Sequence, residues 1–280
     1  MTTIASRLQA VKARISDAAS AAGRRPGEIV LVAVSKTFPP GAIAEAWAAG
    51  QRAFGENYVQ EGVEKIRALA SLSLHPGAAC PEGPLLLPLE WHGASPDDKN
   101  PGSPGDVRPS DGVASPEGPL LLPLEWHYIG PIQSNKTRQI AERFSWVHSV
   151  DRLKIAQRLS EARPASAGPH NVCIQVNLSG EASKGGVSPA DAPALAREIA
   201  RLPRLKLRGL MTIPEPTGDV VVQRSRFRLL RELKDRIVAS GLPMDSLSMG
   251  MSHDLESAIA ECATMVRVGT AIFGERNTDR

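Results

Sequence analysis

Apolar residues along the chain follow two spacings, one typical of helices and the other of buried strands. Between Met1 and Gly23 they recur every three or four residues, which predicts an amphipathic N-terminal helix packed on a larger body. The run from Ile29 to Ser35 is continuously apolar up to its last residue, as expected for a strand buried on both faces. The helical positions are Ile4, Leu8, Val11, Ile15 and Ala19.

The same alternation of strand and helix patterns continues to the C-terminus. It predicts a single α/β domain over residues 1–280, a (β/α)8 TIM barrel with an extra N-terminal helix. A doubly wound open sheet is the alternative, but no GxGxxG motif follows the first strand. Asp151 is expected to cap the helix that ends at Ala162. Further strands are predicted at 52–55, 124–129, 146–150, 171–178, 205–213, 246–249 and 265–268, and further helices at 40–50, 59–69, 151–162, 189–201, 223–240 and 253–262.

Residues 72–123 interrupt the pattern with 11 of the chain's 23 prolines. This segment holds a tandem duplication, because the sequence at 81–92 recurs identically at 116–127. Two copies are too few for a solenoid. We therefore interpret 72–123 as an insertion, with only the second copy entering the third strand; a functional lid is the alternative. In a barrel the insertion would lie on the N-terminal side of that strand, away from the face where active sites form.

Composition excludes several functional classes. The formal net charge is only +3, which disfavours nucleic-acid binding. Three cysteines (Cys80, Cys173 and Cys262) are far apart and lack a CxxC pair, so neither a disulfide framework nor a zinc site is expected. No apolar run approaches the length of a membrane span, and the N-terminus does not resemble a signal peptide. We expect a cytoplasmic protein that binds no membrane.

Catalytic and ligand-binding residues of a barrel follow the carboxyl ends of its strands, and at two such places the sequence has a side-chain amine or amide. Lys36 follows the first apolar strand, where partial desolvation would favour the neutral amine that attacks a carbonyl. A solvated lysine at a strand end is the alternative. In the turn 55–58, Asn57 is suited either to orient a ring or to cap a helix, and Glu56 to pair with a nearby base.

Two further turns are suited to bind an anion. Residues 248–254 combine a glycine with hydroxyls just before a helix, and residues 267–270 follow the last strand. Loops after strands seven and eight commonly bind phosphate in barrels. Plain helix capping by Ser252 is the alternative. A lysine facing a phosphate site fits two proteins: one that binds a cofactor with an aldehyde and a phosphate, or an aldolase that acts on a sugar phosphate. His127 and His148 lie in predicted strands and are expected to be structural.

At these places the sequence closely resembles the YggS/PROSC (PLPBP) family of pyridoxal-phosphate homeostasis proteins. The resemblance covers residues 1–70 and about 124–280, and its motifs together are highly specific. They are AVSKT (33–37), FGENYVQEGVEKI (54–66), WHYIGPIQSNKTR (126–138), VHSVDR (147–152), IQVNLSGEASKGG (174–186), LRGLMTIPEP (207–216), LSMGMSHDLESAIA (247–260) and TMVRVGTAIFGER (264–276).

The resemblance implies a barrel similar to the N-terminal domain of alanine racemase, with pyridoxal 5'-phosphate (PLP) bound as a Schiff base on Lys36. It implies that Ser252, Gly269 and Thr270 hold the phosphate, with Ser248 at the start of the same turn, and that Arg267 faces the pyridine nitrogen. Asn57, Met211 and Met249 would line the cofactor.

The resemblance also implies a carrier of the PLP pool without substantial catalysis, because an arginine at the ring nitrogen weakens the ring as an electron sink. The racemase-type second domain, with its catalytic tyrosine, is absent from the expected architecture. Apo enzymes that use PLP are candidate recipients, and a monomer is expected. A racemase or lyase of low activity is the alternative, an aldolase ranks third, and a pure interaction module fits worst.

Overall fold

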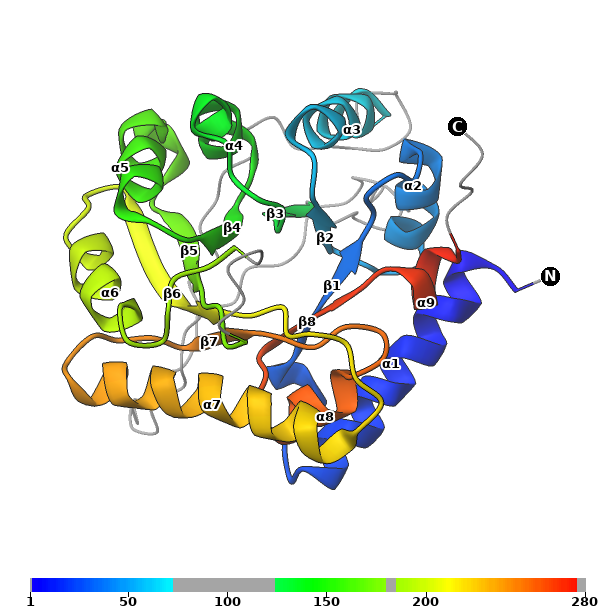
Figure 1. The fold of residues 1–280 in the computed structure, drawn as a ribbon. Helices are drawn as coiled ribbons and strands as arrows, with labels where there is room; N and C mark the ends of the chain where they lie inside the picture. Colours follow the sequence, from blue (N-terminus) through cyan, green and yellow to red (C-terminus); the bar gives the residue numbers. More distant parts are fainter. Residues whose placement is uncertain (1, 73–123, 180–184, 276–280) are drawn as a thin grey trace, which may run out of the picture.

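The structure, a computed structural model, describes residues 2–72, 124–179 and 185–275. Within them eight parallel strands follow one another in chain order, and the last pairs with the first to close a barrel (Figure 1). This closure confirms the predicted fold. The strands are β1 (Val30–Val34), β2 (Ala53–Glu56), β3 (Glu125–Tyr128), β4 (Trp146–Val150), β5 (His170–Gln175), β6 (Leu205–Met211), β7 (Ser246–Ser248) and β8 (Met265–Val268).

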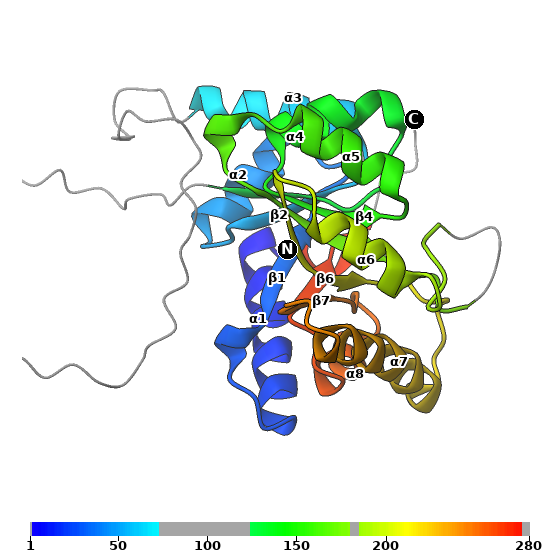
Figure 2. The ribbon, with the colours of Figure 1, turned by 90° about the vertical axis from the view of Figure 1, so that its left-hand side faces the viewer.

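Helices surround the strands, with α3 to α5 on one side and α7 and α8 on the opposite side (Figure 2). The extra N-terminal helix is present as predicted: the apolar face of α1 is buried, and the helix lies against α8 and α9. The helices are α1 (Ile4–Ala21), α2 (Pro40–Ala48), α3 (Val59–Leu72), α4 (Thr137–Arg143), α5 (Leu153–Ala162), α6 (Ala192–Ala200), α7 (Val220–Ala239), α8 (Leu255–Ala260) and α9 (Thr270–Phe273), with short 3-10 turns at Pro26–Glu28, Ser134–Lys136 and Ala165–Ala167.

Alternation along the strands divides the buried residues into two layers. The large core lies between strands and helices and takes side chains such as Phe54, Val147 and Leu247. Inside the barrel a separate apolar cluster consists of Trp146, Cys173, Met211 and Met265. The barrel interior therefore combines a small apolar cluster with the polar residues described below.

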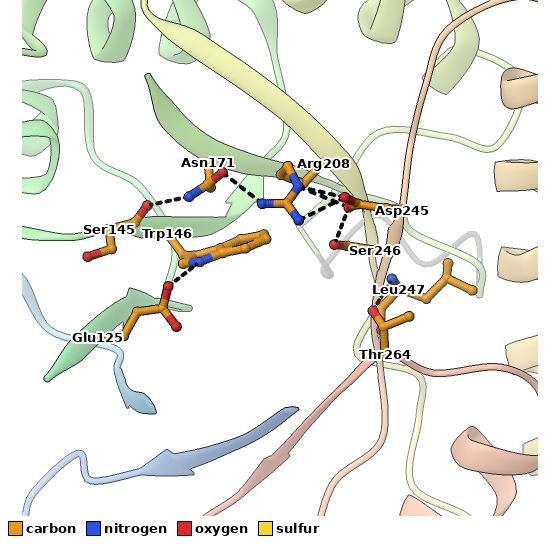
Figure 3. A network of polar contacts seen from close by, with 9 residues as sticks. All are labelled: Glu125, Ser145, Trp146, Asn171, Arg208, Asp245, Ser246, Leu247 and Thr264. Carbon is orange, nitrogen blue, oxygen red and sulfur yellow. Dashed lines mark hydrogen bonds and ion pairs between the residues drawn. The ribbon is translucent and has the colours of Figure 1, made fainter. Parts of the chain in front are cut away.

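A polar network closes the base of the barrel, where the strands begin (Figure 3). The Arg208 guanidinium lies 4.7 Å from the centre of the Trp146 ring and forms a bidentate ion pair with Asp245 at 2.8–3.1 Å. Arg208 also donates to Asn171 at 3.1 Å, and Trp146 Nε1 donates to Glu125 at 2.8 Å. Four neighbouring strands, β3 to β6, are thus tied together at this end and linked to the residue before β7.

The predicted elements agree with the structure except near their ends. Asp151 does not cap α5: the N-cap is Arg152, without a side-chain capping bond, and the Asp151 carboxylate instead accepts from Arg152 at 2.7 Å. The fifth strand ends at Gln175 rather than at 178, because Val176 forms only an isolated bridge with Val187. The duplicated segment lies outside the described residues, so its predicted placement stays a prediction.

In the described part of the chain, no helix is long and apolar enough to cross a membrane. The same residues contain no group of three or more His, Cys, Asp or Glu side chains that could hold a metal ion. Cys173 is buried and Cys262 is exposed, and both are free thiols.

Candidate functional site

Lys36 lies just past the carboxyl end of β1 and is half-buried. The next residue, Thr37, has a φ of +69°, a left-handed conformation that a β-branched side chain rarely adopts. The backbone therefore turns sharply at the lysine. This strained turn is held by a cluster of charged side chains described below.

The turn after β8 packs directly on the end of β1, next to Lys36. Val34 is followed by Ser35 and Lys36, and a Cβ added at Gly269 would lie 3.1 Å from the Val34 carbonyl oxygen. This contact is tighter than most Cβ contacts, so a larger residue requires the Val34 backbone to shift by a few tenths of an ångström. The last strand thus brings Gly269 and Thr270 to the mouth of the barrel beside the lysine.

The turn after β7 lies beside the end of β8, because the Arg267 N–H donates to the Gly250 carbonyl at 2.9 Å. The N-cap of α8 is Asp254, so the alternative in which Ser252 caps this helix is wrong. In the described residues, the hydroxyls of Ser252 and Thr270 form no hydrogen bond. Two uncommitted hydroxyls and two glycine-bearing turns therefore lie on adjacent loops, which suits a phosphate group.

Arg267 is 3% exposed and forms no ion pair within the described residues. Its guanidinium donates to Ser248 Oγ at 2.6 Å and to the Thr212 carbonyl at 2.8 Å. Burial lowers the pKa of Arg267 to about 10, and the charge of Asp254 partly offsets that shift. Because the guanidinium has five N–H donors, it can still donate to an acceptor at the mouth.

Behind Arg267 a chain of hydrogen bonds runs through the barrel interior. Ser248 Oγ lies 2.7 Å from His148 Nδ1, and His148 Nε2 lies 2.9 Å from His127 Nδ1. Burial lowers the pKa of His148 well below its usual value, so its ring is neutral. Since arginine only donates, Ser248 Oγ accepts from Arg267. One nitrogen of the neutral His148 ring donates and the other accepts, so the ring joins Ser248 to His127.

The chain ends at the base of the barrel, where His127 Nε2 lies 3.3 Å from the Glu125 carboxylate without forming a hydrogen bond. His127 and His148 are structural as predicted, but sequence reasoning missed that His148 supports Arg267 through Ser248. The available signal was the alternation within neighbouring strands, which turns both histidines into the barrel interior.

Asn57 follows β2 and has a buried side-chain oxygen without a hydrogen-bond partner. The alternative in which this side chain caps α3 is therefore wrong. The backbone of Asn57 is held tightly: its carbonyl accepts from Tyr128 Oη at 3.2 Å, and a Cβ added at Gly130 would lie 2.1 Å from the same oxygen. An orphaned amide oxygen at the barrel mouth is a group that a ligand can satisfy.

The two predicted methionines lie in different layers. Met211, at the end of β6, belongs to the cluster inside the barrel. Met249 belongs to the core between strands and helices, where Leu255 and Ala258 also lie. The structure thus brings seven predicted residues to the mouth (Lys36, Asn57, Ser248, Ser252, Arg267, Gly269 and Thr270), places Met211 beneath them and turns the Met249 side chain away.

A buried lysine that sequence reasoning did not single out lies behind the Lys36 turn. Lys65 Nζ donates to the Ser35 carbonyl at 2.7 Å and to Glu56 at 2.8 Å. The ion pair with Lys65 confirms the expectation that Glu56 pairs with a nearby base, and Glu56 also accepts from Ser35 Oγ at 2.7 Å. Burial raises the pKa of Glu56, and Lys65 partly offsets the shift.

One of the two tyrosines, Tyr128, is directed at backbone carbonyls rather than at the mouth. Tyr128 belongs to the outer core, and its hydroxyl donates to the carbonyls of Asn57 and Pro131. Burial raises the pKa of Tyr128 to about 12. Tyr58 is 56% exposed.

Two hollows lie outside this cluster of residues. One, of about 350 Å³, is at the base of the barrel and includes Lys12, Arg52 and Glu125. The other, of about 800 Å³, lies between α7 and α8 and includes Gln223 and Asp254. Neither hollow is lined by Lys36 or Arg267, although the larger one includes Met251 and His253 of the turn after β7.

Comparison with known proteins agrees with this geometry. The profile of the family "Alanine racemase, N-terminal domain" matches residues 6–277. A "Pyridoxal phosphate homeostasis protein" of Pseudomonas aeruginosa is 50% identical over 277 residues, covering 99% of this chain and 97% of the relative. The protein of the same name from Escherichia coli is 45% identical, and the match covers 99% of this chain and 98% of the E. coli protein.

This chain belongs to the pyridoxal phosphate homeostasis family. A solved structure of PipY from Synechococcus elongatus, described as having PLP bound, is 31% identical with a TM-score of 0.71, covering 97% of this chain and all of PipY. Alanine racemase of Corynebacterium glutamicum is similar in fold alone, at 15% identity and a TM-score of 0.58, covering 97% of this chain and 62% of the racemase. The family membership covers the whole described barrel.

Proposed function

We propose that this protein binds PLP as a Schiff base on Lys36 and acts in PLP homeostasis without substantial catalysis. The observation that carries the proposal is the convergence of a half-buried lysine, a buried arginine and two glycine-bearing turns at one barrel mouth. This convergence occurs in a chain 50% identical over nearly its full length to a PLP homeostasis protein.

Each residue at the mouth has a chemical counterpart in the cofactor. PLP supplies an aldehyde that condenses with an amine, a phosphate and a pyridine nitrogen. Lys36 provides the amine, and the hydroxyls of Ser252 and Thr270 with the Gly269 backbone provide donors for the phosphate. Arg267, fixed by Ser248 and Thr212, provides a donor for the ring nitrogen, while Asn57 offers its unpartnered amide oxygen.

Two features support binding without substantial turnover. Arg267 is held as a donor by two hydrogen bonds, and a donor at the ring nitrogen disfavours its protonation, which weakens the ring as an electron sink. Tyr128 offers no second acid–base group, because its hydroxyl is committed to backbone carbonyls and has a raised pKa. A racemase or lyase of low activity remains the second candidate, favoured by the likeness to alanine racemase in fold.

The experiment is an absorption spectrum of purified protein with PLP, before and after borohydride, followed by mass measurement of the adduct. We expect a visible band that reduction erases, with the adduct on Lys36. Lys36→Ala should abolish the adduct, and Lys154→Ala, which removes an exposed lysine of α5, should not. A protein that remains colourless with PLP would overturn the proposal and favour the aldolase interpretation.

The catalytic alternative has its own test. Purified holoprotein is incubated with amino acids in deuterated buffer, and the α-carbon protons are followed by NMR. We expect no exchange above that of free PLP. Exchange that depends on both the protein and Lys36 would establish an enzyme instead.

Transfer of the cofactor to apo enzymes and a monomeric state complete the proposal. Mixing holoprotein with an apo PLP enzyme should restore that enzyme's activity faster than the spontaneous release rate of PLP allows. Light scattering should give a mass near 29.9 kDa.

A further inference from the structure

The strongest feature not yet explained is the strained turn that carries Lys36. Thr37 has a φ of +69°, a conformation costing about 1–3 kcal/mol for a residue other than glycine. Such a conformation persists only where the surroundings enforce it. The residues that enforce it are therefore expected to control the geometry of the lysine.

Three charged side chains hold both flanks of Lys36. On one flank, Ser35 is fixed twice: its hydroxyl donates to Glu56 at 2.7 Å, and its carbonyl accepts from Lys65 at 2.7 Å. On the other flank, the Thr37 N–H donates to the Glu61 carboxylate. Lys65 connects the two carboxylates that hold the flanks of Lys36, since its ammonium group contacts both Glu56 and Glu61.

The burial of this cluster argues for a purpose beyond surface stabilisation. The side chains of Lys65 and Glu56 are 5% and 0% exposed, so burying their charges is costly unless they are paired. Glu56 Oε1 accepts from both Lys65 and Ser35, whereas Oε2 has no hydrogen-bond partner in the described residues. All three hydrogen bonds of the Lys65 ammonium are directed at the turn or at the two carboxylates that hold it. A packing role alone would be served equally well by an apolar side chain on α3.

We propose that Glu56, Lys65 and Glu61 are positioning residues, which force the backbone at Thr37 into its left-handed turn and thereby aim Lys36 at the barrel mouth. The proposal rests on the function proposed for Lys36. Without the cluster the turn relaxes, and binding must restore the strained conformation each time. Affinity for PLP should then fall while the barrel remains folded.

The test compares Lys65→Met with wild type and with Lys154→Met, an exposed lysine of α5, as the matched control. We expect Lys65→Met to weaken PLP binding about tenfold, the equivalent of about 1.4 kcal/mol, and to slow formation of the reducible adduct. Lys154→Met should bind as wild type does. Thermal unfolding and circular dichroism establish that each variant is folded.

Relief of the strain provides the decisive variant. Thr37→Gly accepts the positive φ without cost, so adding it to Lys65→Met should restore affinity to within about threefold of wild type. Because Lys65→Met leaves Glu56 buried without its cationic partner, a second variant, Glu61→Ala, removes the acceptor for the Thr37 N–H and keeps the ion pair of Lys65 with Glu56. Lys65 loses its contact with Glu61 in this variant but still donates to the Ser35 carbonyl. Glu61→Ala should also weaken binding, and Thr37→Gly should rescue it.

The outcomes separate this proposal from the proposed function. If wild type forms no adduct, the proposed function fails before the variants are compared. If wild type binds PLP and the folded Lys65→Met and Glu61→Ala variants bind equally tightly and equally fast, the positioning role is wrong. A loss of affinity that Thr37→Gly does not rescue would also overturn it, because strain at Thr37 would then not be what the cluster opposes.

Discussion

Inside the barrel, the imidazole Nδ1 of His148 lies 2.7 Å from the hydroxyl of Ser248, although the two residues are 100 positions apart in the sequence. The contact matters because Ser248 is also the acceptor for Arg267, so a neutral histidine on β4 orients the hydroxyl that holds an arginine on β8. Neither residue can change without affecting the guanidinium at the barrel mouth.

Ser248→Ala should therefore be more harmful than the loss of one hydroxyl suggests. It removes one of the two buried hydrogen bonds of His148 and one of the two of Arg267, and we expect the free energy of unfolding to fall by about 2–3 kcal/mol. Urea denaturation measures the loss, and the absorption maximum of bound PLP reports the displaced arginine. Ser246→Ala is the matched control on the same strand, because its partner Asp245 is largely exposed and water can replace the bond. Equal effects of the two changes would contradict this account.

Stability should decrease in mild acid because of buried His170. Burial lowers the pKa of His170 to about 3, whereas the unfolded value is near 6.5. Below about pH 6.5 the unfolded chain takes up a proton that the folded protein excludes. This histidine's contribution to stability is thus present above pH 6.5 and is lost toward pH 3, by about 1.4 kcal/mol per pH unit.

The variant that tests this linkage is His170→Leu. Neither ring nitrogen of His170 has a hydrogen-bond partner in the described residues, so the change removes no such bond. Unfolding by urea at pH 7.5, 6.0 and 5.0 should give a flatter pH dependence for the variant. Parallel curves for the two proteins would show that another group causes the acid sensitivity.

Gly130→Ala should disrupt the turn beside Asn57. The added Cβ would meet the Asn57 backbone oxygen at 2.1 Å, and a backbone atom cannot rotate away. We expect a destabilisation of about 3 kcal/mol and weaker PLP binding. Gly41→Ala, in α2 with nothing within 4 Å of its Cβ, should instead stabilise the protein by about 0.5 kcal/mol. The melting temperatures of the two variants test this prediction. Similar changes in melting temperature for both would show that the close contact at Gly130 is unimportant.

Deletion of residues 81–115 should leave PLP binding intact. The segment 73–123 connects the end of α3 to the start of β3, and strands begin at the end of the barrel opposite Lys36. The excision is seamless, because residues 116–127 repeat 81–92 identically. Titration with PLP should give the wild-type affinity, and an unstable or non-binding product would disprove the assigned placement.

Much of the barrel could be predicted because its signals are local. A continuous apolar run such as 30–34 needs a sheet covered on both faces, and the single apolar stripe of α1 needs one surface to pack on. The positions of Lys36 and Gly269 just past strand ends follow from the same pattern. Element ends were less certain: Asp151 has the right residue type for a cap, but the helix begins after Arg152.

The sequence by itself determined the alternation of strands and helices, the lysine at the end of the first strand and the family motifs. Only the tertiary structure decided that His148 supports Arg267 through Ser248, that Lys65 holds the Lys36 turn, and that the Met249 side chain leaves the barrel interior. The physical reason is that propensity and hydrophobic period depend on neighbours along the chain, whereas the partner of a buried polar group depends on which strands and helices the closed barrel places side by side.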